Sequence, residues 1–163
     1  MHFFYWDASA LAKRYAPEIG TPLVNALFSK VPLDRMLCLS VGVSEVISVL
    51  VRKKNAGLIT EAIFSQAMVD FRAEVISAAD FQLVGVDDAL VFASHPLIEQ
   101  YSLNATDALV LRSVLDVAAL KRQAGNEVTL LASDRRLLNA ARMEGIPILD
   151  PETTAQEYLD SFI

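Results

Sequence analysis

The sequence predicts an α/β sandwich in which helices pack against a mostly parallel central sheet. Short apolar runs alternate with helical patterns from one end of the chain to the other. This alternation is typical of β-α units in a parallel sheet. No repeat, low-complexity segment or linker interrupts it, so the 163 residues are interpreted as a single domain, 1–163. A domain of this length buries about 70% of the surface that its unfolded chain would expose.

The first half of the chain contains two of the expected strands. The run FFYW (3–6) is interpreted as a buried strand, and a short helix follows it in ALAKRY. The run MLCLSV (36–41) leads into the helix VSEVISVLVRKK, which the residues NAG (55–57) end in the manner common to helices. A second long helix is expected over about residues 60–79.

The second half of the chain repeats this order and supplies three more strands. The pattern predicts, in chain order, the strand QLVGV, a helix beginning near Asp87-Asp88, the helix DALVLRSVLDVAAL, the strand VTLLA, the helix DRRLLNAARMEG and the strand IPIL. Because IPIL comes last, we expect it at an edge of the sheet. VTLLA is expected at a central position.

Composition excludes several classes of protein. A net charge of −6 with 53% hydrophobic residues argues against a protein that coats nucleic acid through bulk positive charge, so any such contact is local. The single cysteine, Cys38, excludes a disulfide framework or a cysteine zinc site and favours a reducing, cytoplasmic compartment. No uncharged apolar run approaches the roughly 18 residues of a membrane span, so we expect a soluble protein without a membrane partner.

Four acidic residues, the acidic quartet, are expected at one edge of this sheet. Asp7 ends the first strand, Asp134 follows VTLLA, and Glu45 lies in the first turn or so of the helix after MLCLSV. Sites in open parallel sheets form outside the carboxyl ends of the strands. Asp107 stands at the start of a strongly apolar helix, and crossover geometry brings helix starts to the same edge.

Each acid also has a purely structural interpretation. Asp7, Asp107 and Asp134 stand near helix starts, where a capping side chain typically contributes about 1 kcal/mol. Glu45 differs, because it interrupts an apolar stretch and has no basic residue within one turn. Four carboxylates at one edge would repel one another unless a cation neutralises them, and oxygen ligands favour Mg²⁺ or Mn²⁺.

Two further acids are available for the fourth place in the quartet. Asp116 follows Asp107 by nine residues, which places it on the opposite side of the same helix. Asp150 ends the last strand, where the turn before Pro151 is a sufficient explanation. Asp134 is therefore preferred.

The chain resembles the PIN domain, and most closely the VapC-type ribonuclease toxins of toxin–antitoxin pairs. Four stretches carry this resemblance by their order and spacing: DASALAKRY, SEVISVL, ATDALVL and LLASDRRLLNAARMEGIPILDP. The resemblance spans nearly the whole chain and implies a three-layer α/β/α sandwich. It assigns catalytic and metal-binding roles to the acidic quartet, and polar support to Ser9 and Ser133. It further implies hydrolysis of RNA with Mg²⁺ or Mn²⁺, a cognate antitoxin protein as partner, and a homodimer.

Basic pairs stand beside two members of the quartet. Lys13 and Arg14 follow Asp7, and Arg135 and Arg136 follow Asp134. They are interpreted either as contacts to substrate phosphates or as solvated faces of helices. Separately, an apolar stripe with helical spacing is interpreted as core or as a dimer surface. Its members are Phe64, Met68, Phe71 and Val75.

Two other functions compete with a nuclease. A phosphatase of the haloacid-dehalogenase type also has an aspartate nucleophile after its first strand, but it needs a second acid where this chain has Ser9. A binding module that keeps the fold and partners an antitoxin without cleaving anything is the remaining interpretation. An assay for metal-dependent cleavage separates it from a nuclease.

Overall fold

A five-stranded sheet, parallel throughout, forms the centre of the computed structural model, which describes residues 1–155 and 159. The spatial order of its strands is β3-β2-β1-β4-β5. The strands are β1 (His2–Trp6), β2 (Met36–Leu39), β3 (Gln82–Val84), β4 (Glu127–Leu131) and β5 (Ile148–Leu149). The expected fold class is confirmed, and so are the edge position of the last strand and the interior position of β4.

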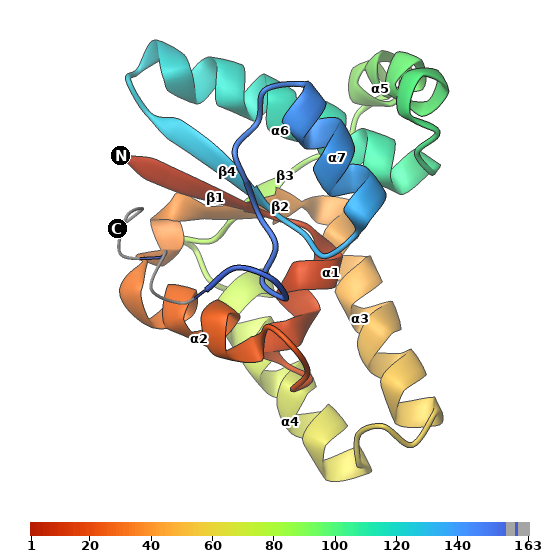
Figure 1. Cartoon of the computed structure of the whole chain (residues 1–163). Helices are drawn as coiled ribbons and strands as arrows, with labels where there is room; N and C mark the ends of the chain where they lie inside the picture. The colour runs from red at the N-terminus through yellow and green to blue at the C-terminus, as the bar shows by residue number, and fades with distance from the viewer. Residues whose placement is uncertain (156–158, 160–163) are drawn as a thin grey trace.

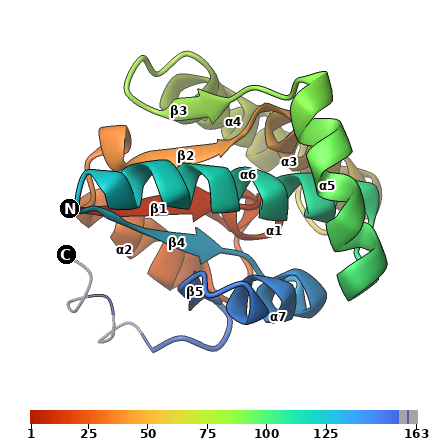
Figure 2. The same ribbon diagram turned by 90° about the horizontal axis from the view of Figure 1, so that it is seen from above.

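Helices cover both faces of the sheet and complete three layers (Figures 1 and 2). The α-helices are α1 (Ala8–Leu11), α2 (Thr21–Lys30), α3 (Ser40–Asn55), α4 (Glu61–Phe71), α5 (Asp88–Tyr101), α6 (Ala105–Gln123) and α7 (Arg135–Met143). Three short turns are η1 (Ala12–Arg14), η2 (Leu33–Arg35) and η3 (Arg72–Ile76). Helices α1 to α4 pack on one face, and α5 to α7 pack on the other.

The central strand β1 contributes to both hydrophobic cores. Phe4 and Trp6 lie in the core beneath α1 to α4, whereas Phe3 and Tyr5 lie in the core beneath α5 to α7. Successive side chains of a strand point to opposite faces, so a strand buried on both faces reads as one continuous apolar run. This explains why FFYW shows no alternation with polar residues.

The long helix expected over residues 60–79 is shorter than predicted. Thr60 caps α4 by accepting a hydrogen bond from the Ile63 N–H, at 3.2 Å, and α4 ends at Phe71. The chain continues through η3, a wider π-helical turn, rather than through a regular helix. Hydrophobic spacing does not distinguish these turns over so short a stretch.

The apolar stripe on α4 and η3 belongs to the core. Phe71 and Val75 are buried, and Phe64 and Met68 are partly buried against the same cluster. The core interpretation is confirmed, whereas the homodimer stays a prediction. Within residues 1–155 and 159, every helix is too short or too polar to traverse a lipid bilayer.

Candidate active site

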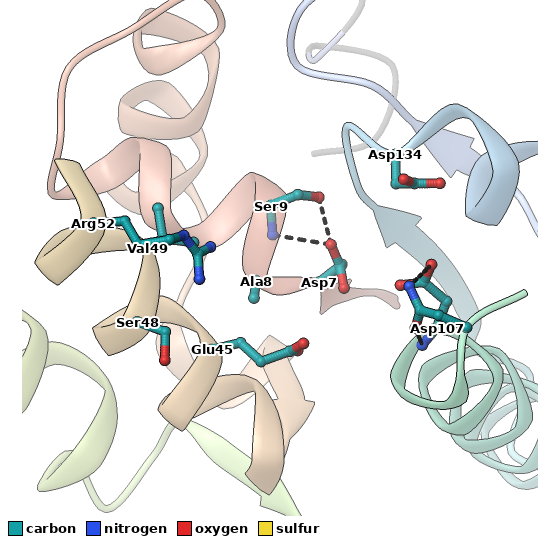
Figure 3. A pocket seen from close by; sticks show the side chains of 10 residues that line it. Asp7, Ala8, Ser9, Glu45, Ser48, Val49, Arg52, Asp107 and Asp134 are labelled. Carbon is teal, nitrogen blue, oxygen red and sulfur yellow. Dashed lines mark hydrogen bonds between the residues drawn. The ribbon is translucent and has the colours of Figure 1, made fainter. Parts of the chain in front are cut away.

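A cavity of about 380 Å³ lies at the carboxyl edge of the sheet, and all four acids of the quartet line it (Figure 3). Asp7 follows β1 and Glu45 projects from α3, while Asp107 lies in the first turn of α6 and Asp134 joins β4 to α7. The structure therefore brings together four acids that are widely separated in the sequence.

Asp7 is the most deeply placed of these carboxylates. Its side chain is 6% exposed and caps α1, because Oδ2 accepts hydrogen bonds from the Ser9 N–H at 2.9 Å and from the Ser9 hydroxyl. The Ser9 Oγ in turn accepts the Ser133 N–H at 2.9 Å. Burial raises the pKa of Asp7, the bonds from Ser9 oppose that rise, and the charge of Asp134 adds to it. The expected role of Asp7 as a helix cap is confirmed. The hydrogen bonds of this cap bring no positive charge to balance the carboxylate.

Asp107 lies in the first turn of α6, as expected from the sequence. Asn104 is the cap: its Oδ1 accepts the Asp107 N–H, and its Nδ2 donates to Asp107 Oδ2, both at 2.8 Å. This reciprocal pair fixes the direction of the carboxylate. Burial raises the pKa of Asp107 to about 6, and the charges of Asp7 and Asp134 contribute to the rise.

Glu45 lies in the second turn of α3, slightly later than expected, and is half-buried. Burial raises its pKa to about 7, and the charges of Asp7 and Asp107 add to this effect, whereas Arg52 opposes it. A carboxyl group in an apolar helix with two anionic neighbours is unfavourable in its charged form. The expectation that Glu45 needs a positive partner is therefore supported by its surroundings.

Asp134 is exposed and caps α7. Its Oδ1 accepts the N–H groups of Arg136 and Leu137, at 2.8 and 2.9 Å. Arg136 also donates from Nη1 to the carbonyl of Ser102, at 3.0 Å, and its charge opposes the rise in the pKa of Asp107. Arg135 is exposed at the same helix start.

The other basic pair is held by carboxylates. Lys13 is only 3% exposed, and its Nζ contacts Glu18 at 3.0 Å and Glu152 at 2.7 Å. The guanidinium of Arg14 makes two hydrogen bonds to Glu74, at 2.8 and 3.2 Å. Contacts from Lys13 or Arg14 to a substrate phosphate stay a prediction, and they would require these ion pairs to open.

A second cavity, of about 330 Å³, adjoins the first and shares Ser9 and Asp134 with it. Lys13 and Glu152 lie on its wall, as does Ser133. The Ser133 Oγ is buried and forms no hydrogen bond within residues 1–155 and 159. The expected support by Ser133 thus comes from its backbone N–H group.

The chemistry of the quartet suits a hard divalent cation. The donors are carboxylate oxygens, and burial together with neighbouring negative charge raises the pKa values of Asp7, Glu45 and Asp107. Such a set fits Mg²⁺ or Mn²⁺. In the part of the chain that the structure describes, no three His, Cys, Asp or Glu side chains already form a complete ligand group. Binding would therefore require the carboxylates to turn toward the centre of the cavity.

One charged residue of the cavity was not predicted as a site residue from the sequence. Arg52, near the end of α3, lines the cavity together with the quartet. It stands seven residues after Glu45, a spacing that returns to nearly the same side of a helix. This spacing could have identified it, although Arg52 also stands in a basic group with Lys53 and Lys54, and such a group is typical of a solvated helix end.

The raised pKa values predict how stability changes with pH in the absence of a divalent ion. The folded state keeps protons on Glu45 and Asp107 that the unfolded state has already released, so the free energy of unfolding should fall as pH rises from about 4 to about 7. In EDTA, we expect a higher melting temperature near pH 5 than near pH 8, and Mg²⁺ should reverse the loss near pH 8. Thermal melts of the E45Q/D107N double variant provide the control, because its melting temperature should depend less on pH. The same pH dependence in the variant and the wild type would contradict this prediction.

Comparison with known proteins shows the fold. No protein-family model and no curated protein matches the chain. Among solved structures, PAE2754 from Pyrobaculum aerophilum is 17% identical with a TM-score of 0.61, over 98% of this chain and 96% of that chain. FitAcB from Neisseria gonorrhoeae is 14% identical with a TM-score of 0.59, over 93% and 100%. A toxin–antitoxin complex from Klebsiella pneumoniae is 17% identical with a TM-score of 0.54, over 90% and 96%.

Proposed function

We propose that the protein is a metal-dependent endoribonuclease of the PIN type, and the toxin of a VapC-like toxin–antitoxin pair. The observation that carries this proposal is the convergence of four carboxylates on one cavity, where burial and neighbouring negative charge raise the pKa values of Asp7, Glu45 and Asp107. Among the solved structures that share the fold, the toxin–antitoxin complex from Klebsiella pneumoniae supports the toxin part of this proposal.

The quartet would hold one or two Mg²⁺ or Mn²⁺ ions. The chemistry that such an ion supplies when bound is activation of a water molecule and stabilisation of negative charge on the phosphodiester. The chain's own residues orient the ligands for this purpose: Ser9 fixes the Asp7 carboxylate, and Asn104 fixes that of Asp107. Asp134 is held by the first N–H groups of α7, which also favour negative charge nearby.

A cognate antitoxin would restrain this activity by covering the same cavity. An acidic, partly apolar cavity is complementary to a basic or apolar side chain of a small partner protein. In this proposal the protein acts in the cytoplasm on RNA, without a membrane partner. The homodimer is part of the same proposal.

Cleavage of total RNA by the purified protein tests the function directly. We expect new RNA ends with Mg²⁺ or Mn²⁺, no cleavage in EDTA, and recovery when excess Mg²⁺ is restored, because the quartet alone repels phosphate. Sequencing of the new ends would identify the target. A protein that binds RNA or an antitoxin but leaves RNA intact with both ions would instead be the non-catalytic binding module.

A further inference from the structure

We infer that Arg52 is a phosphate-binding residue of the acidic cavity, placed to hold a substrate phosphate next to the one that is cleaved. The inference rests on the proposed nuclease function and deepens it, because it implies a substrate that extends beyond the reacting bond. Arg52 lines the cavity, and Figure 3 shows its side chain extending from α3 on the same side of the helix as Glu45.

The guanidinium of Arg52 has no protein partner in the part of the chain that the structure describes. Lys13, the other basic residue that lines either cavity among the described residues, is engaged by two glutamates. Arg52 affects the pKa of Glu45 through its charge, yet the two side chains form no ion pair. Its five N–H donors are therefore available to a ligand.

The position of Arg52 along α3 determines which phosphate it can reach. Seven residues correspond to about 10.5 Å along the helix axis and a rotation of about 20° from Glu45. Ser48 lines the cavity between them. Side chains on a helix lean toward the N-terminus of that helix, so the guanidinium of Arg52 extends toward the acids but forms no ion pair with them. The guanidinium is therefore placed beside the four acids, where a bound RNA strand would cross the cavity.

The chemistry of the guanidinium group suits a phosphate ligand. A guanidinium presents parallel N–H donors that match two phosphate oxygens, and the pair is charge-assisted. A protein with a net charge of −6 and an acid-lined cavity repels a polyanion, so a local cation at the cavity wall offsets part of that repulsion. A lone phosphate would need only the metal site, whereas a nucleic acid strand has further phosphates for Arg52.

RNA binding measured by fluorescence anisotropy tests this inference without relying on catalysis. A labelled single-stranded RNA is titrated in Ca²⁺, another cation with oxygen ligands, near pH 8, where Glu45 is ionised. R52A should weaken binding about tenfold and reduce the slope of log affinity against log salt by about 0.7, the value for one phosphate contact with a single strand. R52K should keep the slope, and R72A, at an exposed arginine that lines neither cavity, should match the wild type.

Substrate length gives the second measurement. A dinucleotide has only the phosphate that is cleaved, so R52A should lose much less of its kcat/KM on a dinucleotide than on a longer RNA, whose KM should rise most. An unchanged salt slope, or an equal loss on both substrates, would overturn the role of Arg52. A wild-type protein that neither binds nor cleaves RNA with a divalent ion would instead overturn the nuclease function itself, so the two failures are distinguishable.

Discussion

Substitution of Asp7 by asparagine is expected to reduce Mg²⁺-dependent RNA cleavage by more than about a hundredfold, since even changes behind the ligands of a metal site cost 10–100-fold. Asparagine keeps the oxygen that caps α1 but removes the charge. Because burial and the charge of Asp134 both disfavour ionised Asp7, the melting temperature of D7N without metal should equal or exceed that of the wild type. Loss of activity with equal or greater stability is the expected pattern.

The matched control for D7N is D87N. Asp87 caps α5 through a hydrogen bond from the Leu90 N–H to its Oδ1, at 2.8 Å, and it lines neither cavity. The same chemical change at a cap outside the site should therefore leave cleavage unaffected. Full activity in D7N would contradict the proposed mechanism, and a D7N protein that melts well below the wild type would contradict the electrostatic explanation.

The second large effect is expected at Asp134, compared with two acids that lie elsewhere. D134N should lose most of the cleavage activity, because Asp134 lines the cavity and adds to the charge felt by Asp7 and Asp107. Asp116 is paired with Arg112 on the outer side of α6, and Asp150 accepts the Glu152 N–H at 2.9 Å after the edge strand. Single-turnover rates with Mg²⁺ should therefore be close to normal in D116N and D150N.

Stability measurements separate this prediction from a folding effect. Asparagine is as good a cap as aspartate, so D134N should keep α7 intact and melt near the wild-type temperature. Equal losses of activity in all three variants would indicate a general disturbance of the fold. A selective loss in D116N would mean that the assignment of the fourth acid to Asp134 is wrong.

Much of the fold could be predicted because local patterns determine it. Apolar runs that are buried on both faces identify β1, β2 and β4, and parallel pairing places their carboxyl ends at one edge. That rule is enough to bring Asp7 and Asp134 together from the sequence alone. Glu45 was identifiable for a different reason, because a carboxylate inside an apolar helix needs compensation.

Other features depend on contacts between distant residues and could not be predicted. The ion pair between Lys13 and Glu152 joins residues that are 139 positions apart in the sequence, so no local pattern predicts it. The spacing from Glu45 indicates the side of α3 on which Arg52 lies, but only the packing of α3 determines that this side faces the cavity. The π-helical turn after Phe71 leaves no signal in hydrophobic spacing. In each case, the local sequence is compatible with more than one structure, and contacts in the folded protein determine which one forms.

The strand order also determines when the site can form during synthesis. Both neighbours of β1 must be present to enclose it, and one of them, β4, begins at Glu127. A growing chain that has left the ribosome only as far as residue 126 contains Asp7, Glu45 and Asp107, but it has neither the fourth acid nor the strand that carries it. The nascent polypeptide therefore lacks a complete acidic quartet until residues beyond 126 have emerged.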